Sequence, residues 1–266
     1  LTDVILHNPF DDPQDVEVFY VPTGETRARS GKRTIVTLGA NEIREIPDAL
    51  RALYGVESGS GVLHFHPTQG ISVTARTYSR NANGGTFGYG MNPTDFYNAA
   101  GPRFPLTFAG AFPGAHFRTN LLLADTSSRG TEVELRAFDR SGAVRETAFT
   151  SAAPAGGVGQ HNGLAPSLGL LDDESGGLTL QPKRGTVITG LVAIDNRTND
   201  PTYFPPDIPA NVPRMIPVVG HLDGANGSRF RSDLYLLNPS SEARTITLEA
   251  KQWDSATRKD VQFTLL

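Results

Sequence analysis

The sequence contains no cysteine. Structural disulfides, thiolate metal sites and cysteine nucleophiles are therefore excluded, although this absence does not fix the compartment. No apolar run has the length of a membrane span, and no signal peptide is recognisable. The 24 basic residues are outnumbered by 28 acidic ones and form no stripe interleaved with aromatic residues, so a nucleic-acid-binding surface is not expected.

Glycine and proline are abundant, with 28 and 19 copies in 266 residues. This composition favours many turns over long helices. The length suits two ordinary domains or one large β domain. The chain begins with Leu1 directly before a strand-like run, which we interpret as removal of a leader or as a cut within a longer protein.

One phrase recurs three times, a short polar opening followed by four or five mostly apolar positions. The step is 117 residues from Asp3 to Asn120 and 113 residues from Asn120 to Asp233. A phrase that returns at long intervals indicates a structural unit used again. The three copies are TDVILHNP (2–9), TNLLLADT (119–126) and SDLYLLNP (232–239).

A hairpin is predicted after each copy, because apolar and polar residues alternate with the period of a half-buried strand. Its first strands are 15–21, 131–138 and 244–253, and its second strands are 33–38, 144–150 and 259–266. A leader strand is predicted before the second and third copies, at 104–110 and 216–222. A short helix is predicted at 46–55, and its counterpart at 164–171 is limited to one turn by Pro166.

The unit ends with a pair of strands, at 61–80 and 177–196. A register that matches Leu63 with Leu178 and Phe65 with Leu180 also matches Gly70 with Gly185. The same alignment matches Val73 with Ile188, and we adopt it over an alignment shifted by one residue.

Short strands at regular spacing, separated by turns, are typical of two antiparallel sheets packed face to face. The sequence therefore predicts an all-β protein of tandem immunoglobulin-like β-sandwich modules of about 115 residues, the third incomplete. The predicted modules are module 1 (1–102, without a leader strand), module 2 (103–213) and a partial module 3 (214–266).

The phrases FRSDLYLLNPS, GSGVLHF and VTARTYSRNANGGTFG resemble an immunoglobulin-like module repeated in bacterial secreted and cell-surface proteins. The second copy departs from this pattern, since it lacks the run Arg76-Thr77-Tyr78 and has Ala-Asp-Thr in place of Asn-Pro. The resemblance implies an extracellular or envelope-associated spacer, stalk or assembly module with no catalytic residue.

Two histidines, His64 and His66, alternate along a predicted strand, so both imidazoles would point to one face and could hold a metal ion. The adopted alignment of the two repeat copies matches His64 with Thr179 and His66 with Gln181, on the polar side of the strand. We therefore expect an exposed pair that binds no metal, with a metal site as the alternative.

Acidic residues cluster at Asp11, Asp12 and Asp15 and again at Asp172, Asp173 and Glu174. Carboxylates that converge from one loop are suitable ligands for calcium, but neither cluster has the spacing of an EF-hand loop. Solvated turns are the expected structure, and calcium bound between modules is the alternative. No other cofactor is expected.

Aromatic residues gather between 81 and 104, including Phe87, Tyr89, Phe96 and Tyr97. Rings on a loop can stack on sugars or fill a groove of a partner, and they can also pack the linker against its own module. The glycine-rich stretch 81–90 leads into further loop and not into a helix, so no phosphate cradle is expected.

We therefore expect a non-catalytic extracellular or cell-envelope module of a filament, stalk or lattice. The alternatives are a carbohydrate- or ligand-binding accessory module and a hydrolase whose site assembles only in space. A half-module at 214–266 would expose an apolar face and unpaired strand edges. We expect it to meet the N-terminal module of another copy, head to tail, or the rest of a longer parent chain.

Overall fold

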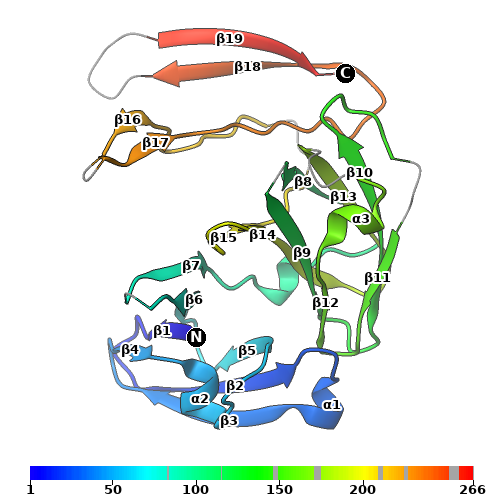
Figure 1. Ribbon diagram of the computed structural model, residues 1–266. Coiled ribbons are helices and arrows are strands. Elements are labelled where there is room, and N and C mark those ends of the chain that lie inside the picture. The colour runs from blue at the N-terminus through cyan, green and yellow to red at the C-terminus, as the bar shows by residue number, and fades with distance from the viewer. Residues whose placement is uncertain are drawn as a thin grey trace.

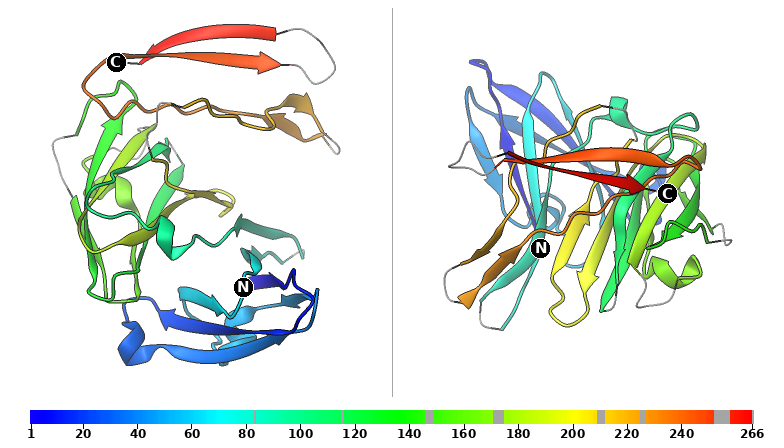
Figure 2. Two further views of the ribbon diagram at one scale, coloured as in Figure 1. Left: turned by 180° about the vertical axis from the view of Figure 1, so that it is seen from behind. Right: turned by 90° about the horizontal axis from the view of Figure 1, so that it is seen from above.

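The computed structural model describes residues 1–82, 84–114, 116–145, 149–170, 175–208, 212–224, 227–251 and 258–265. The protein is all-β, with 53% of residues in strands and 8% in helices. Figures 1 and 2 show three groups of strands that follow one another along a curve, from the blue N-terminal group through the green group to the orange C-terminal hairpins.

Module 1 consists of two sheets packed against each other. One has the order β4-β1-β6-β7 and the other the order β3-β2-β5. Their elements are β1 (Thr2–His7), β2 (Gln14–Pro22), α1 (Arg27–Ser30), β3 (Lys32–Leu38), β4 (Ile43–Ile46), α2 (Ala49–Tyr54), β5 (Gly61–Pro67), β6 (Ser72–Arg80) and β7 (Thr86–Met91). Alternate residues of facing strands, such as Leu6 and Val18, are fully buried between the two sheets.

Module 2 repeats this plan with one strand more. Its sheets have the orders β12-β9-β14-β15 and β11-β10-β13-β8. The elements are η1 (Phe96–Asn98) in the preceding linker, β8 (Leu106–Pro113), β9 (Phe117–Asp125), β10 (Thr131–Asp139), β11 (Phe149–Ala153), β12 (Val158–His161), α3 (Leu164–Ser167), β13 (Ser175–Arg184), β14 (Val187–Asp195) and β15 (Pro201–Phe204). The additional strand, β8, is the predicted leader, and it pairs with β13.

The hydrogen-bonded registers of the two modules confirm the first half of the predicted alignment. Phe65 lies opposite Val18, and Leu180, the residue aligned with Phe65, lies opposite Leu135. The second half is wrong by one residue, because Leu6 lies opposite Val73 whereas Leu123 lies opposite Thr189 and not Ile188.

A β-bulge explains this shift in register. In module 2, Val133 lies opposite Pro182 but Glu132 lies opposite Arg184, so Lys183 is an extra residue in the strand. A bulge inserts one residue into one strand of a pair, and everything after it is displaced by one. One fixed step in sequence number between modules 1 and 2 therefore cannot match both strands of the pair.

The helix predictions are confirmed at α2 and at the single turn α3, whereas α1 was not predicted. Part of the predicted linker 81–104 is strand β7. Its Gly88 lies against the strand beside it, where a Cβ would come 2.5 Å from the Cβ of Tyr78. The glycine therefore permits a close approach of two strands and does not mark a loop.

The C-terminal segment forms two hairpins, β16 (His221–Asp223) with β17 (Arg229–Arg231) and β18 (Arg244–Lys251) with β19 (Arg258–Leu265). The predicted opening strand at 232–239 is not part of a sheet in the described structure. Its counterparts β1 and β9 each lie between two strands. A strand needs hydrogen-bonding neighbours, and 232–239 has no such pair among the described residues.

The C-terminal segment packs on module 2 through two glycines that leave room for its side chains. A Cβ at Gly110 would come 2.5 Å from the ring of Tyr235, and a Cβ at Gly177 would come 2.9 Å from Leu237. Modules 1 and 2 also meet directly, where β7 lies beside β15 and the rings of Tyr89 and Tyr203 stack at 5.9 Å (Figure 1).

Candidate functional site

Strand β5 directs Leu63 and Phe65 toward the core of module 1 and His64 and His66 toward the opposite face. The expectation that both histidines are exposed is wrong for His64, which is only 5% exposed. The ring of Phe96, from the linker after module 1, stacks on the imidazole of His64 at 5.5 Å. The outer face of the strand is therefore covered by segments distant in the sequence.

Burial keeps the imidazole of His64 neutral. Desolvation, together with the nearby charges of Arg27 and His66, lowers the pKa of His64 to about 4, against an opposing contribution from the backbone of Gly156. Burial and Arg27 lower the pKa of His66 as well. The Nε2 atoms of both histidines are buried and have no hydrogen-bond partner.

The two imidazoles lie 6.4 Å apart, centroid to centroid. Within the described ranges of the chain, no group of three or more histidine and carboxylate side chains is close enough to share a metal ion. The metal candidates Asp172, Asp173 and Glu174 lie outside the described residues. In the other acidic cluster, Asp11 accepts a hydrogen bond from Asn41 and Asp15 accepts one from Thr37.

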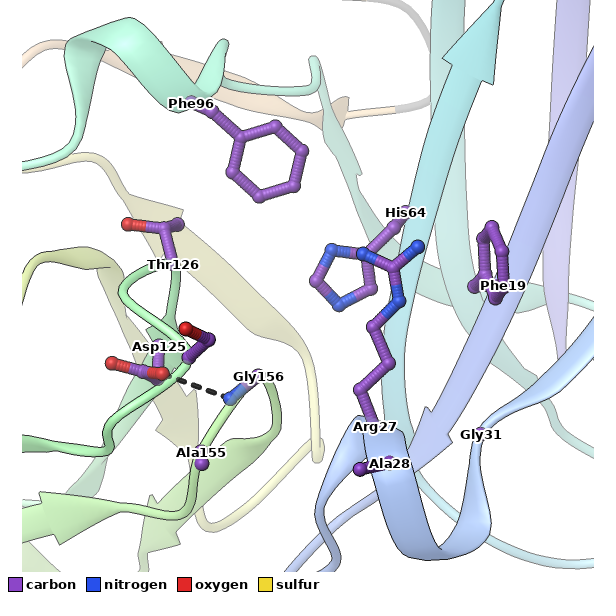
Figure 3. A pocket seen from close by; sticks show the side chains of 11 residues that line it. Phe19, Arg27, Ala28, Gly31, His64, Phe96, Asp125, Thr126, Ala155 and Gly156 are labelled. Carbon is purple, nitrogen blue, oxygen red and sulfur yellow. Dashed lines mark hydrogen bonds between the residues drawn. The ribbon is translucent and has the colours of Figure 1, made fainter.

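His64 lines a cavity of about 430 Å³ between modules 1 and 2 (Figure 3). One side of the cavity comes from β2, α1 and β5, and the other from two loops of module 2, with the linker above them. The lining residues are Phe19, Arg27, Ala28, Gly31, His64, Phe96, Asp125, Thr126, Ser128, Ala155 and Gly156.

Arg27 reaches the cavity from α1, a single turn whose start is capped by Thr26. The Thr26 hydroxyl accepts a hydrogen bond from the backbone N–H of Arg29 at 3.2 Å. The backbone N–H of Arg27 donates to the carbonyl of Ala155 in module 2 at 3.3 Å. Its guanidinium lies 4.0 Å from the centroid of the Phe19 ring, a cation–π contact.

Asp125 faces Arg27 from module 2 and is completely buried. Its carboxylate accepts hydrogen bonds from the hydroxyls of Thr131 and Ser127, at 2.5 and 2.7 Å, and from the backbone N–H of Gly156 at 2.8 Å. Burial raises the pKa of this carboxyl, but the hydrogen bonds outweigh burial and hold the pKa below its usual value. The carboxylate is thus charged and occupied by its own loops.

Neither Arg27 nor Asp125 was predicted from the sequence as a site residue. The signal for Asp125 was its alignment with Asn8, another fully buried residue at the end of the opening strand. For Arg27, the sequence indication was Thr26 directly before it, a residue suited to capping the start of a helix. Neither signal shows that the two side chains approach each other, because that depends on how the modules pack.

Of the four aromatic residues proposed as ligand contacts, only Tyr97 is completely exposed. Phe96 covers His64, and Tyr89 packs on Tyr203 of module 2, where burial raises the pKa of both phenols. Phe87 is half-buried on β7. Tyr89 and Phe96 therefore both contact a module, although Phe96 is still 41% exposed, and ligand binding by the four residues stays a prediction.

None of the helices in the described parts of the chain has the length and hydropathy that crossing a membrane requires. Comparison of the chain with protein-family models, curated proteins and solved structures finds no match.

Proposed function

We propose that this protein is a non-catalytic structural module of an extracellular or cell-envelope assembly, such as a filament, stalk or lattice. Its tandem units are proposed to be immunoglobulin-like β-sandwiches, and its partners to be further copies of itself or the rest of a longer parent chain. The single observation that carries the proposal is the apolar surface of the C-terminal segment.

Apolar side chains of this segment are exposed to an extent that is uncommon on a protein surface that contacts only water. Val218 is 83% exposed and Met215 is 85% exposed. The exposed large apolar residues of the segment are Met215, Ile216, Val218, Val219, Leu222, Phe230, Leu234, Tyr235, Leu236 and Val261. Covering them with a protein surface would be favourable.

Module 1 offers a complementary edge, as comparison with module 2 indicates. In module 2 the leader strand β8 pairs with β13, and Leu178 and Leu180 of β13 are completely buried. Their counterparts on β5, Leu63 and Phe65, are only partly buried. Among the described residues β5 has one neighbouring strand, β2, so its second edge can accept another strand.

Residues 216–220 have the sequence of a leader, since Ile-Pro-Val-Val-Gly resembles Phe-Pro-Leu-Thr-Phe at 104–108. Residues 216–219 are exposed, and the whole stretch 216–220 lies outside any strand. Addition of this segment to β5 of another copy, in the register of β8 on β13, would place Val218 opposite Phe65. Such a contact joins two different surfaces, so it propagates head to tail.

The packing of modules 1 and 2 also supports a structural role. Backbone bridges join Thr23 to Val158 and Ala100 to Val187, and Tyr89 stacks on Tyr203. Contacts at several points along the boundary would hold the spacing of the modules, which a spacer or stalk requires.

Analytical ultracentrifugation of the full chain tests the proposal. We expect association that grows with concentration and that Val218→Asp suppresses, since the change places a charge in the contact. The matched control Val144→Asp alters an exposed valine of module 2 and should leave association unchanged. A chain that remains monomeric at high concentration would contradict the self-assembly proposal.

Cysteine pairs locate the contact, because the natural chain has no cysteine to interfere. The double variant Phe65→Cys/Val218→Cys should form disulfide-linked oligomers on oxidation. The control pair Ile35→Cys/Val218→Cys tests β3, the opposite edge of the same sheet. Oligomers that form only with the control pair would show that β5 is not the acceptor.

A further inference from the structure

We propose that the cavity between modules 1 and 2 binds a small molecule that carries a carboxylate on a flat apolar body. This inference goes beyond the structural role proposed above and does not depend on it. It follows from one cation, one neutral imidazole ring and two phenylalanine rings that line the cavity (Figure 3).

The cation is Arg27. Throughout the described part of the chain, no carboxylate lies within 4.0 Å of its guanidinium, and the ring of Phe19 is the group packed against it. Some other arginines of module 1 do have acidic partners, as Arg33 has in Glu17 and Arg44 has in Glu42. The planar guanidinium presents paired N–H donors that match the two oxygens of a carboxylate.

Asp125 does not act as the counterion of Arg27, although it lines the same cavity. Its two oxygens accept hydrogen bonds from Thr131, Ser127 and Gly156, and from Gly130 at 3.4 Å. These neutral donors hold the carboxylate in its own loops, although they do not remove its negative charge. Arg27 is the cation among the lining residues, and no carboxylate of the described chain is paired with it.

The ring of His64 adds to the lining of the cavity, beside the ring of Phe96. Its Nε2 atom is buried in a residue only 5% exposed, so a ligand would pack against the neutral ring and would not reach this nitrogen.

The apolar body of the ligand follows from the rest of the lining. Phe19 and Phe96 contribute aromatic rings, and Ala28, Gly31 and Ala155 add small residues without hydrogen-bonding side chains. A mostly apolar cavity with a few convergent polar groups, and a volume of about 430 Å³, is typical of small-molecule sites. Flat rings pack favourably on such phenylalanine faces.

Titration calorimetry of the full chain with benzoate tests the inference. Benzyl alcohol has the same body without the charge, and acetate has the charge without the body. We expect benzoate to bind at least tenfold more tightly than either, because each probe lacks one of the two groups that the cavity recognises. Equal binding of benzoate and benzyl alcohol would overturn the proposal, and so would no binding of benzoate below about 10 mM.

The matched variants are Arg27→Gln and Arg29→Gln, two changes on the same helical turn. Arg29 is exposed and does not line the cavity. We expect Arg27→Gln to weaken benzoate binding at least tenfold and Arg29→Gln to leave it unchanged. The His64 ring resonances should shift on benzoate addition in the wild type. Benzoate binding that survives Arg27→Gln would place the ligand elsewhere and refute the assignment.

Discussion

Asn8 and Asp125 occupy equivalent positions at the ends of the opening strands, but Asn8 both donates and accepts hydrogen bonds, whereas Asp125 only accepts them. The Asn8 side-chain N–H₂ donates to the carbonyls of Asp12 and Gly39, at 2.9 and 2.8 Å. Its side-chain oxygen accepts from Gln14 at 2.6 Å. Asp125, in contrast, only accepts. Asn8→Asp is therefore expected to damage module 1 although aspartate is natural at the equivalent position.

The magnitude follows from the partners of the Asn8 amide. Loss of two hydrogen bonds costs about 2 kcal/mol, and burying a carboxylate at the position of Asn8, facing two carbonyl oxygens, adds about 1–3 kcal/mol. We expect Asn8→Asp to lower the free energy of unfolding by about 4 kcal/mol at pH 7. Asn92→Asp, at an exposed asparagine after β7, should change it by less than about 0.5 kcal/mol.

The pH dependence gives the sharper test. Burial beside carbonyl oxygens would raise the pKa of the introduced carboxyl in the folded protein above its unfolded value. Its folded form then binds a proton that the unfolded chain releases, so the loss of stability grows as pH rises through this interval. The destabilisation should be smaller at pH 4 than at pH 7.

Urea unfolding followed by circular dichroism measures both effects, and hydrogen exchange of the β1 and β2 segments assigns the transition to module 1. If Asn8→Asp unfolds at the wild-type urea midpoint, the polarity of this hydrogen-bond network does not matter. If its loss is the same at pH 4 and pH 7, the introduced carboxyl is not buried among carbonyls.

Three further predictions concern module 2 and the boundary. Asp125→Asn should lower the free energy of unfolding by about 2–3 kcal/mol in urea titration, because an amide N–H₂ would face donors; wild-type stability would contradict this. Leu178→Ala should lower the free energy of unfolding by about 3 kcal/mol and Leu63→Ala by about half as much, since only Leu178 is completely buried. If thermal or urea unfolding ranks the two variants in reverse, the role given to β8 is refuted. The pKa of His64 is lowered in the folded protein to about 4 from its ordinary 6.5. Its contribution to the free energy of unfolding is therefore complete above pH 6.5 and is lost as the pH falls toward 4. His64→Gln should therefore flatten the decline of the urea midpoint between pH 6.5 and 4.5, whereas His221→Gln, at an exposed site, should leave it as in the wild type.

The sequence by itself determined the repeated unit and many of its strands, although β4, β12 and β15 were not predicted and 232–239 does not pair in a sheet of the described residues. Alternation along 15–21 and 131–138 required one buried face, which fixed Val18 and Leu135 as core residues and Phe65 and Leu180 as their partners. The helix at α2 and the single turn at α3 followed from apolar spacing and from Pro166. These features depend on local periodicity and on the chemistry of single residues, which a sequence records directly.

The bulge at Lys183 and the burial of His64 were decided only by the tertiary structure. An extra residue in a strand leaves alternation nearly intact, so its position is visible only in the hydrogen-bonded register. The outer face of β5 is polar by pattern, yet Phe96 and the module 2 loops cover it. The cavity joins Arg27, His64, Phe96 and Asp125 because separate modules pack together, and no local pattern encodes a contact between segments so far apart.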